Sequence, residues 1–215
     1  MPPITLWFLQ ASRCIRTAWL LEELGLDYEV KFSPRENGIA PAAFKKEAGG
    51  LGKFPTLQDG DVTLYESGNI AEYLCDTYDK QHRLLPPLGD PKRYEVLQWV
   101  HAAEATWALH GIAILYVRWH QKDGDVKKTE EGLSKNVIND MNLLESTLEK
   151  SSGKFLLGDK VTVADTLMHF SAVFILARDL GVKGEDYPRC KKFIQDCEAT
   201  ESYKKAVERT GHSLG

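Results

Sequence analysis

The residues around Ser12 could stabilise a negatively charged sulfur. Ser12 stands at the start of an expected helix, and Arg13 and Arg16 follow within its first turn. The positive end of the helix dipole disfavours cations in that turn, and a bound anion would remove the conflict. A helix start, a hydroxyl and an arginine all favour the ionised form of a nearby thiol, so a bound thiolate is one candidate for the anion. The alternative is structural, since serine is a common N-cap residue.

A proline at the beginning of a short strand could present backbone to a ligand. The strand segment runs from Lys53 to Leu57, with Pro55 in its middle. If the bond before Pro55 is cis, the N–H and C=O of Phe54 turn outward, and an extended peptide can pair with them as an added strand. The alternative is that Pro55 only marks a sheet edge, because proline cannot donate to a β-ladder.

Glu66 and Ser67 could hold the head of an α-amino acid. Such a head needs an acid for its ammonium group and hydroxyl or amide donors for its carboxylate. Glu66, Ser67 and the helix that begins there supply both, close to a strand that could pair with a peptide. Without that neighbour, the pair would be an N-cap serine and a solvated acid that favours the helix dipole.

The four cysteines give little sign of metal or disulfide chemistry. They form no Cys-x-x-Cys pair, and Cys190 and Cys197 are spaced for one face of a helix. We therefore predict no zinc site and no other metal site, and a reducing, cytoplasmic setting. Cys14 lies two residues after Ser12, and we interpret it as a buried helix residue.

The first 80 residues alternate between strand and helix periodicity. Strands are expected at 4–9 and 28–32, a hairpin at 56–65 that turns at Asp59-Gly60, and helices at 13–24, 41–48 and 67–78. This order predicts a right-handed βαβ unit joined to an antiparallel strand pair, with helices on the faces of the sheet.

After a linker rich in proline and glycine, the chain keeps only helical periodicity. Pro86, Pro87 and Gly89 interrupt any helix there. Beyond it, Thr162 and Asp165 form a capping box, and the apolar stripes predict a helix bundle with short amphipathic helices near the C-terminus. The expected division is an α/β domain at 1–80, a linker at 81–90 and an all-helical domain at 91–215.

Composition excludes several classes of function. The chain has 215 residues, 43% hydrophobic and 27% charged, with 27 basic and 31 acidic side chains and a net charge of −4. This balance disfavours nucleic acid and anionic membranes as partners.

The longest uncharged runs, 105–117 and 166–177, are shorter than the roughly 20 residues of a membrane span, so we predict no integral membrane segment. Peripheral association with an organelle membrane stays open. The apolar stretch from Met1 to Leu9 has no basic leader and no cleavage pattern, and we expect a first strand there.

Taken together, these motifs resemble the cytosolic glutathione transferases, and among them most closely the fungal GTT class. The resemblance covers nearly the whole chain, and the order of its motifs carries it: Ser12 to Arg16, Trp19 to Gly25, Lys53 to Leu57, Glu66-Ser67, and Thr162 to Asp165. The family implies a thioredoxin-like N-terminal domain followed by an all-helical C-terminal domain, and a homodimer. It also implies glutathione as co-substrate and small hydrophobic electrophiles as partners, in detoxification.

The resemblance also assigns roles to residues in the first domain. Ser12 matches the serine that donates a hydrogen bond to the glutathione sulfur, with Arg13 beside it. Phe54 would pair with the cysteinyl unit next to a cis Pro55. The remaining matches are Lys53 for the glycyl carboxylate, with a solvated lysine as the alternative, and Glu66 with Ser67 for the γ-glutamyl head.

In the helical domain the assignments concern the electrophile. His101, Glu104 and Trp107 are candidates for the wall of its pocket, and core packing is the alternative for the aromatic residue. His110, on the same helix, is expected to be a packing residue with its hydrogen bonds satisfied. The chain departs from many relatives at Gly49-Gly50, where a proline is usual, and we expect more backbone freedom there.

Three functions remain open at this point. The first is a serine-type transferase that conjugates glutathione to electrophiles, with peroxidase activity toward organic hydroperoxides as a side reaction. The second is a glutathione-dependent carrier protein with weak turnover, and the third is a thiol reductase that uses Cys14. The Ser12 motif favours the first two.

Overall fold

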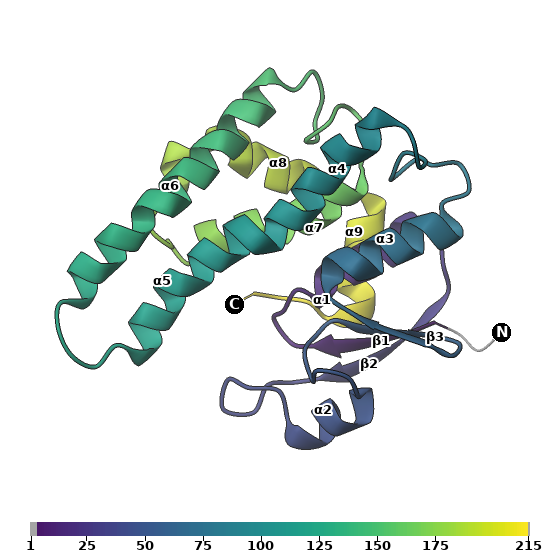
Figure 1. The fold of residues 1–215 in the computed structure, drawn as a ribbon, viewed down its shortest axis with the longest axis horizontal. Helices are drawn as coiled ribbons and strands as arrows, with labels where there is room; N and C mark the ends of the chain where they lie inside the picture. The colour runs from purple at the N-terminus through teal and green to yellow at the C-terminus, as the bar shows by residue number, and fades with distance from the viewer. Residues whose placement is uncertain (1–3, 215) are drawn as a thin grey trace. The chain divides into compact units, whose positions relative to one another are not determined.

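The computed structural model describes residues 4–214 and separates into two units, Met1–Gly89 with Ala199–Gly215, and Asp90–Glu198 (Figure 1). Residues 1–3 and Gly215, at the outer ends of the expected domain ranges, lie outside the described residues.

The first unit is a four-stranded mixed sheet with helices packed against it. Its strands are β1 (Ile4–Leu9), β2 (Tyr28–Ser33), β3 (Thr56–Asp59) and β4 (Val62–Tyr65), and they lie in the order β2-β1-β3-β4. The β1 and β2 strands are parallel, and the other two pairings are antiparallel. Its helices are α1 (Cys14–Glu23), α2 (Ala42–Ala48), α3 (Ser67–Tyr78) and α9 (Glu201–Thr210). This is the thioredoxin-like arrangement that the sequence order predicts.

The register of the sheet gathers four chain segments at one end. Trp7 on β1 pairs with Thr56 on β3, and Thr56 pairs with Tyr65 on β4. Leu9, the last residue of β1, pairs with Ser33, the last residue of β2. The chain therefore leaves β1, β2 and β4, and enters β3, at the same end of the sheet. Three of these segments contain the candidate residues Ser12, Phe54-Pro55 and Glu66-Ser67, and the fourth is the loop after β2.

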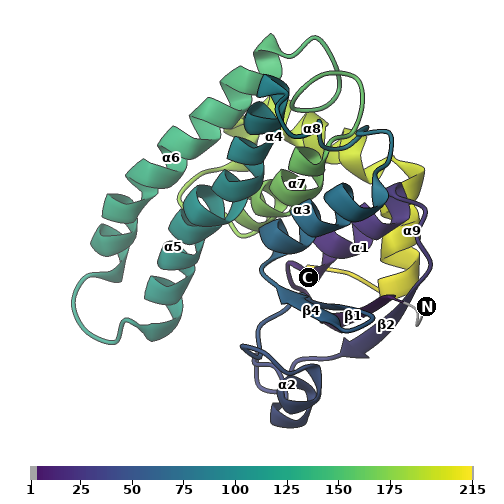
Figure 2. The same cartoon turned by 45° about the vertical axis from the view of Figure 1, so that its right-hand side comes forward.

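The last helix, α9, packs against α1 in the first unit (Figure 2). The indole Nε1 of Trp19 donates to Ser202 Oγ at 3.0 Å, and that hydroxyl donates to Glu23 at 2.5 Å. Arg209 forms an ion pair with Glu22 at 3.2 Å and places its guanidinium 4.4 Å from the centre of the Tyr28 ring. The structure thus groups residues 199–215 with the N-terminal unit, whereas the expected division placed them in the helical domain. Polar contacts of this kind join residues about 180 positions apart, and amphipathic periodicity does not show where a helix packs.

Removing the Ser202 hydroxyl is expected to destabilise this packing. In Ser202→Ala, the buried N–H of Trp19 loses its acceptor, and leaving such a donor unsatisfied costs about 2 kcal/mol in the free energy of unfolding. Urea denaturation monitored by circular dichroism measures the change. Ser146→Ala is the matched control, because that hydroxyl donates only within its own helix, to the carbonyl of Leu143. Equal stability of the two variants would contradict the prediction.

Among its described residues, the second unit consists of helices joined by loops, with one isolated β-bridge between Phe155 and Gly158. It contains α4 (Pro91–Ala102), the π-helical segment η1 (Ala103–Ala108), α5 (Leu109–His120), α6 (Val126–Lys150), α7 (Val163–Leu176), the short 3₁₀ helix η2 (Gly184–Asp186) and α8 (Pro188–Glu198). The capping box at the start of α7 is confirmed, with the N–H of Thr162 donating to Asp165 Oδ2 at 2.7 Å. The described helices, from α1 to α9, include none with the length and hydrophobicity needed to cross a bilayer.

Candidate functional site

Ser12 lies in a tight, strained turn between β1 and α1. Ala11 has a φ of +48°, which is unusual for a residue other than glycine. The hydroxyl of Ser12 donates to the carbonyl of Leu9 at 2.7 Å and accepts from the N–H of Cys14 at 3.3 Å. Ser12 thus satisfies one N–H of the first helical turn, while Arg13 occupies the N-cap position itself. The same oxygen is placed to turn its proton toward an anion at this helix start.

The Arg16 side chain points into the protein and does not form a cationic patch with Arg13 at the helix start. Its side chain is 1% exposed, and its Nη1 donates to Ser67 Oγ at 3.0 Å. Because the Ser67 oxygen accepts from a cation, its own proton is available to donate, and donors polarised in this way form stronger hydrogen bonds. No sequence pattern indicates this contact, since it joins residues 51 positions apart.

The Phe54–Pro55 peptide bond is cis, as the family resemblance implies. The Phe54 ring stacks on Phe44 of α2, with 4.8 Å between ring centres, and Phe44 packs against Trp7 of β1 at 5.4 Å. The hydroxyl of Thr56 donates to the carbonyl of Lys53 at 2.9 Å. These contacts fix the segment from both sides.

The backbone of Phe54 is free to bind a ligand. Within residues 4–214, neither its N–H nor its C=O has a hydrogen-bond partner. Backbone groups of a folded chain are nearly always paired with protein or water, so this pair is available to an extended peptide.

Glu66 joins β4 to α3 in a conformation that only a few residues adopt. Its φ is +70°, and its side chain is exposed and makes no capping bond. No partner for its carboxylate is found among the described residues. Strained residues cluster at ligand sites, and here the strain holds an uncommitted acid next to the half-satisfied hydroxyl of Ser67.

Cys14 is a core residue of the first unit. It is fully buried, and its sulfur donates to the carbonyl of Trp7 at 3.6 Å. Burial raises the pKa of the Cys14 thiol to about 11, so the group stays protonated and unreactive at neutral pH. Cys75, Cys190 and Cys197 are also buried and free. This environment disfavours the reductase alternative.

The three candidates in the helical unit lie in different surroundings. His101 is exposed, Glu104 is half-buried, and Trp107 is 2% exposed with its ring 5.5 Å from that of Trp99. Trp107 therefore packs as a core residue, which was the alternative interpretation. Its indole Nε1 has no hydrogen-bond partner in the described part of the chain, and it sits in the π-helical segment η1. Unpaired buried donors and π-helical turns both occur often at functional sites.

His110 has the packing role that the sequence predicts. Its Nδ1 lies 2.6 Å from a carboxylate oxygen of Asp140 on α6, within the helical unit.

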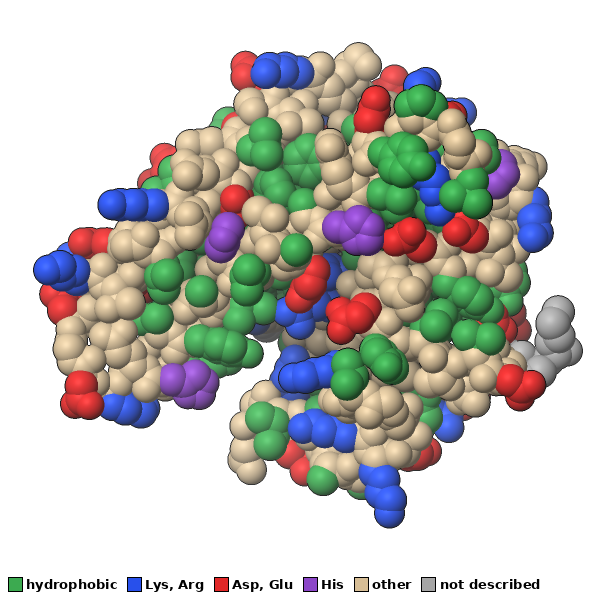
Figure 3. Space-filling view, viewed as in Figure 1, with side chains coloured by type: hydrophobic (Ala, Val, Ile, Leu, Met, Phe, Trp, Pro, Cys, Tyr) green, Lys and Arg blue, Asp and Glu red, His purple; other side chains and the backbone are tan. Residues whose placement is uncertain are grey.

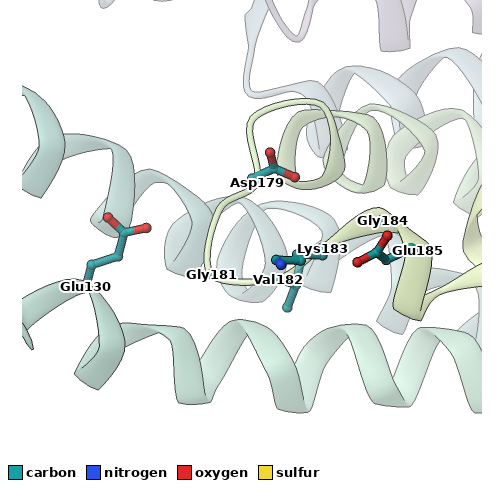
Figure 4. A pocket seen from close by; sticks show the side chains of 7 residues that line it. All are labelled: Glu130, Asp179, Gly181, Val182, Lys183, Gly184 and Glu185. Carbon is teal, nitrogen blue, oxygen red and sulfur yellow. The ribbon is translucent and has the colours of Figure 1, made fainter. Parts of the chain in front are cut away.

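A cavity of about 580 Å³ also lies in the helical unit, and none of the candidate residues lines it. Figure 4 shows that its lining comes from Glu130 on α6 and from residues 179–185, which connect α7 to α8. Glu130 is already paired with Arg118. The cavity adds no residue to the candidate site, and no cluster of three metal-ligating side chains occurs within residues 4–214.

The loop before Lys53 uses glycine where its backbone requires it. Gly49 and Gly50 have φ values of +70° and +59°, and a Cβ on Gly50 would lie 3.0 Å from the Tyr65 ring. The departure from the family pattern at these two positions therefore coincides with a turn that other residues adopt only with strain.

The sheet order β2-β1-β3-β4, with a cis-proline directly before β3 and a separate helical unit, defines a thioredoxin-like protein with an all-helical second domain. A family model described as the N-terminal domain of glutathione S-transferases matches residues 12–77, and a model of their C-terminal domain matches residues 108–208. The chain belongs to the glutathione S-transferase family.

Individual relatives agree with this assignment. Glutathione S-transferase 3 of Schizosaccharomyces pombe is 28% identical, over 96% of this chain and 87% of its own length, which supports the fungal resemblance. A crystal structure of a glutathione S-transferase from Actinobacillus pleuropneumoniae is 31% identical with a TM-score of 0.85, over 98% of this chain and 94% of that one. A glutathione transferase homologue from Lodderomyces elongisporus, solved with two GSH per subunit, has a TM-score of 0.80 and 24% identity, over 97% and 99% of the two chains.

Proposed function

We propose that this protein activates the thiol of glutathione through Ser12 and transfers the tripeptide to electrophilic carbon. The observation that carries the proposal is the unpaired backbone of Phe54 with Ser12 on one side and Glu66 on the other. Since β3 lies between β1 and β4, and neighbouring strands are about 4.8 Å apart, the segments with Ser12 and Glu66 are separated by roughly 10 Å. An extended tripeptide also spans about 10 Å, so a ligand paired with Phe54 can reach both.

The γ-glutamyl head would bind at the start of α3. The free carboxylate of Glu66 offers a partner for the ammonium group. Ser67, polarised by buried Arg16, and the first N–H groups of α3 offer donors for the carboxylate. The bonds to charged groups make this end the main source of affinity.

The glycyl carboxylate would face a basic region. Lys45 and Lys46 lie in the last turn of α2, and Lys53 follows in the next loop. Lys and Arg side chains gather over the α2 region (Figure 3). We assign Lys53 to this carboxylate, because it directly precedes Phe54, and the neighbouring cations raise the local concentration of an anionic ligand.

The sulfur would lie at the start of α1, where the Ser12 hydroxyl would turn its proton from the Leu9 carbonyl to the sulfur and Arg13 would add positive charge. A thiol with a pKa of about 8.5 is only roughly 3% ionised at pH 7, and lowering that pKa by about two units makes roughly three quarters of it thiolate. Because a weaker base is also a weaker nucleophile, ionisation alone gives only about a threefold net gain. Holding the two reactants in attack geometry must supply the rest.

In the transfer step, the thiolate sulfur forms a bond to the electrophilic carbon, and the leaving group departs with the bonding electrons. For an aryl halide the products are the thioether and a halide ion. We assign the electrophile contacts to His101 and Glu104, while Trp107 packs in the core of the segment that carries Glu104. A homodimer and a cytoplasmic location remain proposals drawn from the family resemblance.

Hydroperoxide reduction is the proposed side reaction of the same thiolate. The sulfur attacks the terminal oxygen and releases an alcohol, which leaves glutathione as its sulfenic acid. A second glutathione then converts the sulfenic acid to the disulfide with loss of water.

An assay of conjugation to a model aryl halide tests the proposal, with Cys14→Ala as the variant that separates the mechanisms. We expect the wild-type protein to form the thioether and Cys14→Ala to keep at least half of its rate, because the Cys14 sulfur is buried and protonated. The same proteins are tested with cumene hydroperoxide. Loss of both activities in Cys14→Ala, with the protein still folded by circular dichroism, would overturn the serine mechanism in favour of the reductase alternative.

A further inference from the structure

Arg35, in the loop after β2, holds the turn that carries Ser12. Its backbone N–H donates to the side-chain oxygen of Gln10 at 3.1 Å, and its Nε donates to the Gln10 carbonyl at 3.0 Å. Its Nη1 also donates to the carbonyl of Gly38 at 3.1 Å. Gln10 and Arg35 thus bind each other reciprocally, side chain to backbone in both directions.

The turn needs such a restraint because its backbone is strained. Gln10 is tied to β2 through its N–H, which donates to the carbonyl of Ser33 at 2.9 Å. The next residue, Ala11, has a φ of +48°, and left-handed conformations of this kind persist only where neighbouring contacts enforce them. Arg35 supplies these contacts before Ala11, and the bond from Ser12 to the Leu9 carbonyl supplies them after it. Arg35 and Ser12 thus restrain the same turn from the two sides of Ala11.

The charge of Arg35 also reaches the start of α1. Burial raises the pKa of Cys14, and the hydrogen bond from Ser12 and the positive charge of Arg35 partly oppose that rise. A thiolate near Ser12 would feel the same field, although Arg35 is exposed and solvent screens its charge.

We propose that Arg35 is a positioning residue for thiol activation, which acts by fixing the Gln10–Ser12 turn so that the Ser12 hydroxyl meets the glutathione sulfur. This inference rests on the proposed function, because it assigns Arg35 an effect through Ser12. One strand, β1, separates the β2 end that carries Arg35 from β3, and two strands, β1 and β3, separate it from β4, so the contacts assigned to the γ-glutamyl and cysteinyl units do not include Arg35.

The test measures the pKa of the bound thiol directly, from the ultraviolet absorbance of the thiolate in the enzyme–glutathione complex titrated with base. In Arg35→Met we expect this pKa to rise by about one unit, which lowers the thiolate fraction at pH 7 roughly threefold, from about three quarters to about one quarter. The dissociation constant of glutathione at pH 6.5 is expected to change less than threefold. Arg83→Met is the matched control, since Arg83 also donates to a backbone carbonyl and to a side chain, both of Glu23, but touches no candidate residue. An unchanged thiol pKa in Arg35→Met would overturn the inference.

Two further variants separate positioning from charge and from failure of the proposed function. Arg35→Lys keeps the charge but lacks the planar group that reaches Gln10 and Gly38 together, so we expect it to recover less than half of the shift. If Arg35→Lys restored the wild-type thiol pKa in full, the effect would come from the charge of Arg35, and its positioning role would be overturned. In the Ser12→Ala background, Arg35→Met is expected to cause no further rise in the pKa of the bound thiol. Additive rises in the double variant would overturn the positioning role of Arg35. If Ser12→Ala alone leaves the thiol pKa unchanged, the proposed function itself fails.

Discussion

Ser12→Ala is expected to lower kcat/KM for conjugation by about 10²-fold, the effect typical of removing one preorganised donor to a developing or bound anion. The loss has two parts. The bound thiol loses its hydrogen bond and returns toward its solution pKa, and the sulfur loses the contact that orients it. Affinity for glutathione is expected to fall much less, because the charged contacts at Glu66 and Ser67 are intact. Steady-state kinetics at pH 6.5 together with titration calorimetry separates the two quantities.

Ser12→Thr is the control for this substitution. Threonine keeps the hydroxyl that donates to the Leu9 carbonyl and accepts from Cys14, and it adds one methyl group to a residue that is 7% exposed. We expect it to retain more activity than Ser12→Ala. If Ser12→Ala turned over at the wild-type rate, thiol activation would have to come from Arg13 and the helix start alone.

Glu66→Gln is expected to weaken glutathione binding by at least about 30-fold, because a charge-assisted hydrogen bond to the ammonium group contributes about 2 kcal/mol or more. The variant keeps the size of the side chain and its polar character, so the strained backbone between β4 and α3 is perturbed least. The thermal midpoint of the free protein is expected to stay within a few degrees, since the carboxylate has no partner among the described residues. Titration calorimetry gives the dissociation constant.

Two comparisons make the Glu66 result specific. Glu29→Gln removes an exposed acid from β2, on the far side of the sheet from β4, and should leave affinity unchanged. A tripeptide analogue without the α-ammonium group should bind the wild-type protein and Glu66→Gln about equally. A strong preference of Glu66→Gln for glutathione over that analogue would place the ammonium group elsewhere.

The sequence was sufficient for the parts of the fold that depend on local patterns. The first strand and the helix over 67–78 occur at the expected residues, because a short apolar run ends at the polar Gln10 and a serine stands at the helix start. The capping box of α7 likewise lies within four consecutive residues. The candidate residues Ser12, Phe54-Pro55 and Glu66-Ser67 could be named because each stands next to the end of such an element.

The contacts that tie these residues together were beyond sequence reasoning. The bond from Arg16 to Ser67 and the reciprocal pair of Gln10 and Arg35 join different elements, and an arginine in sequence does not reveal whether it is buried or which loop it reaches. Interpreting Arg13 and Arg16 as neighbours in one helical turn placed both beside the same anion. The structure instead turns Arg16 inward, beneath the start of α3.

The return of α9 to the first unit bears on the order in which the protein can assemble during translation. The ribosome delivers the sheet before the helical unit, but the helix that covers Trp19 and Tyr28 is synthesised after that unit. The helical unit, from Asp90 to Glu198, has its whole chain available before that helix emerges. Of the two units, the one whose synthesis begins earlier is therefore the one completed later.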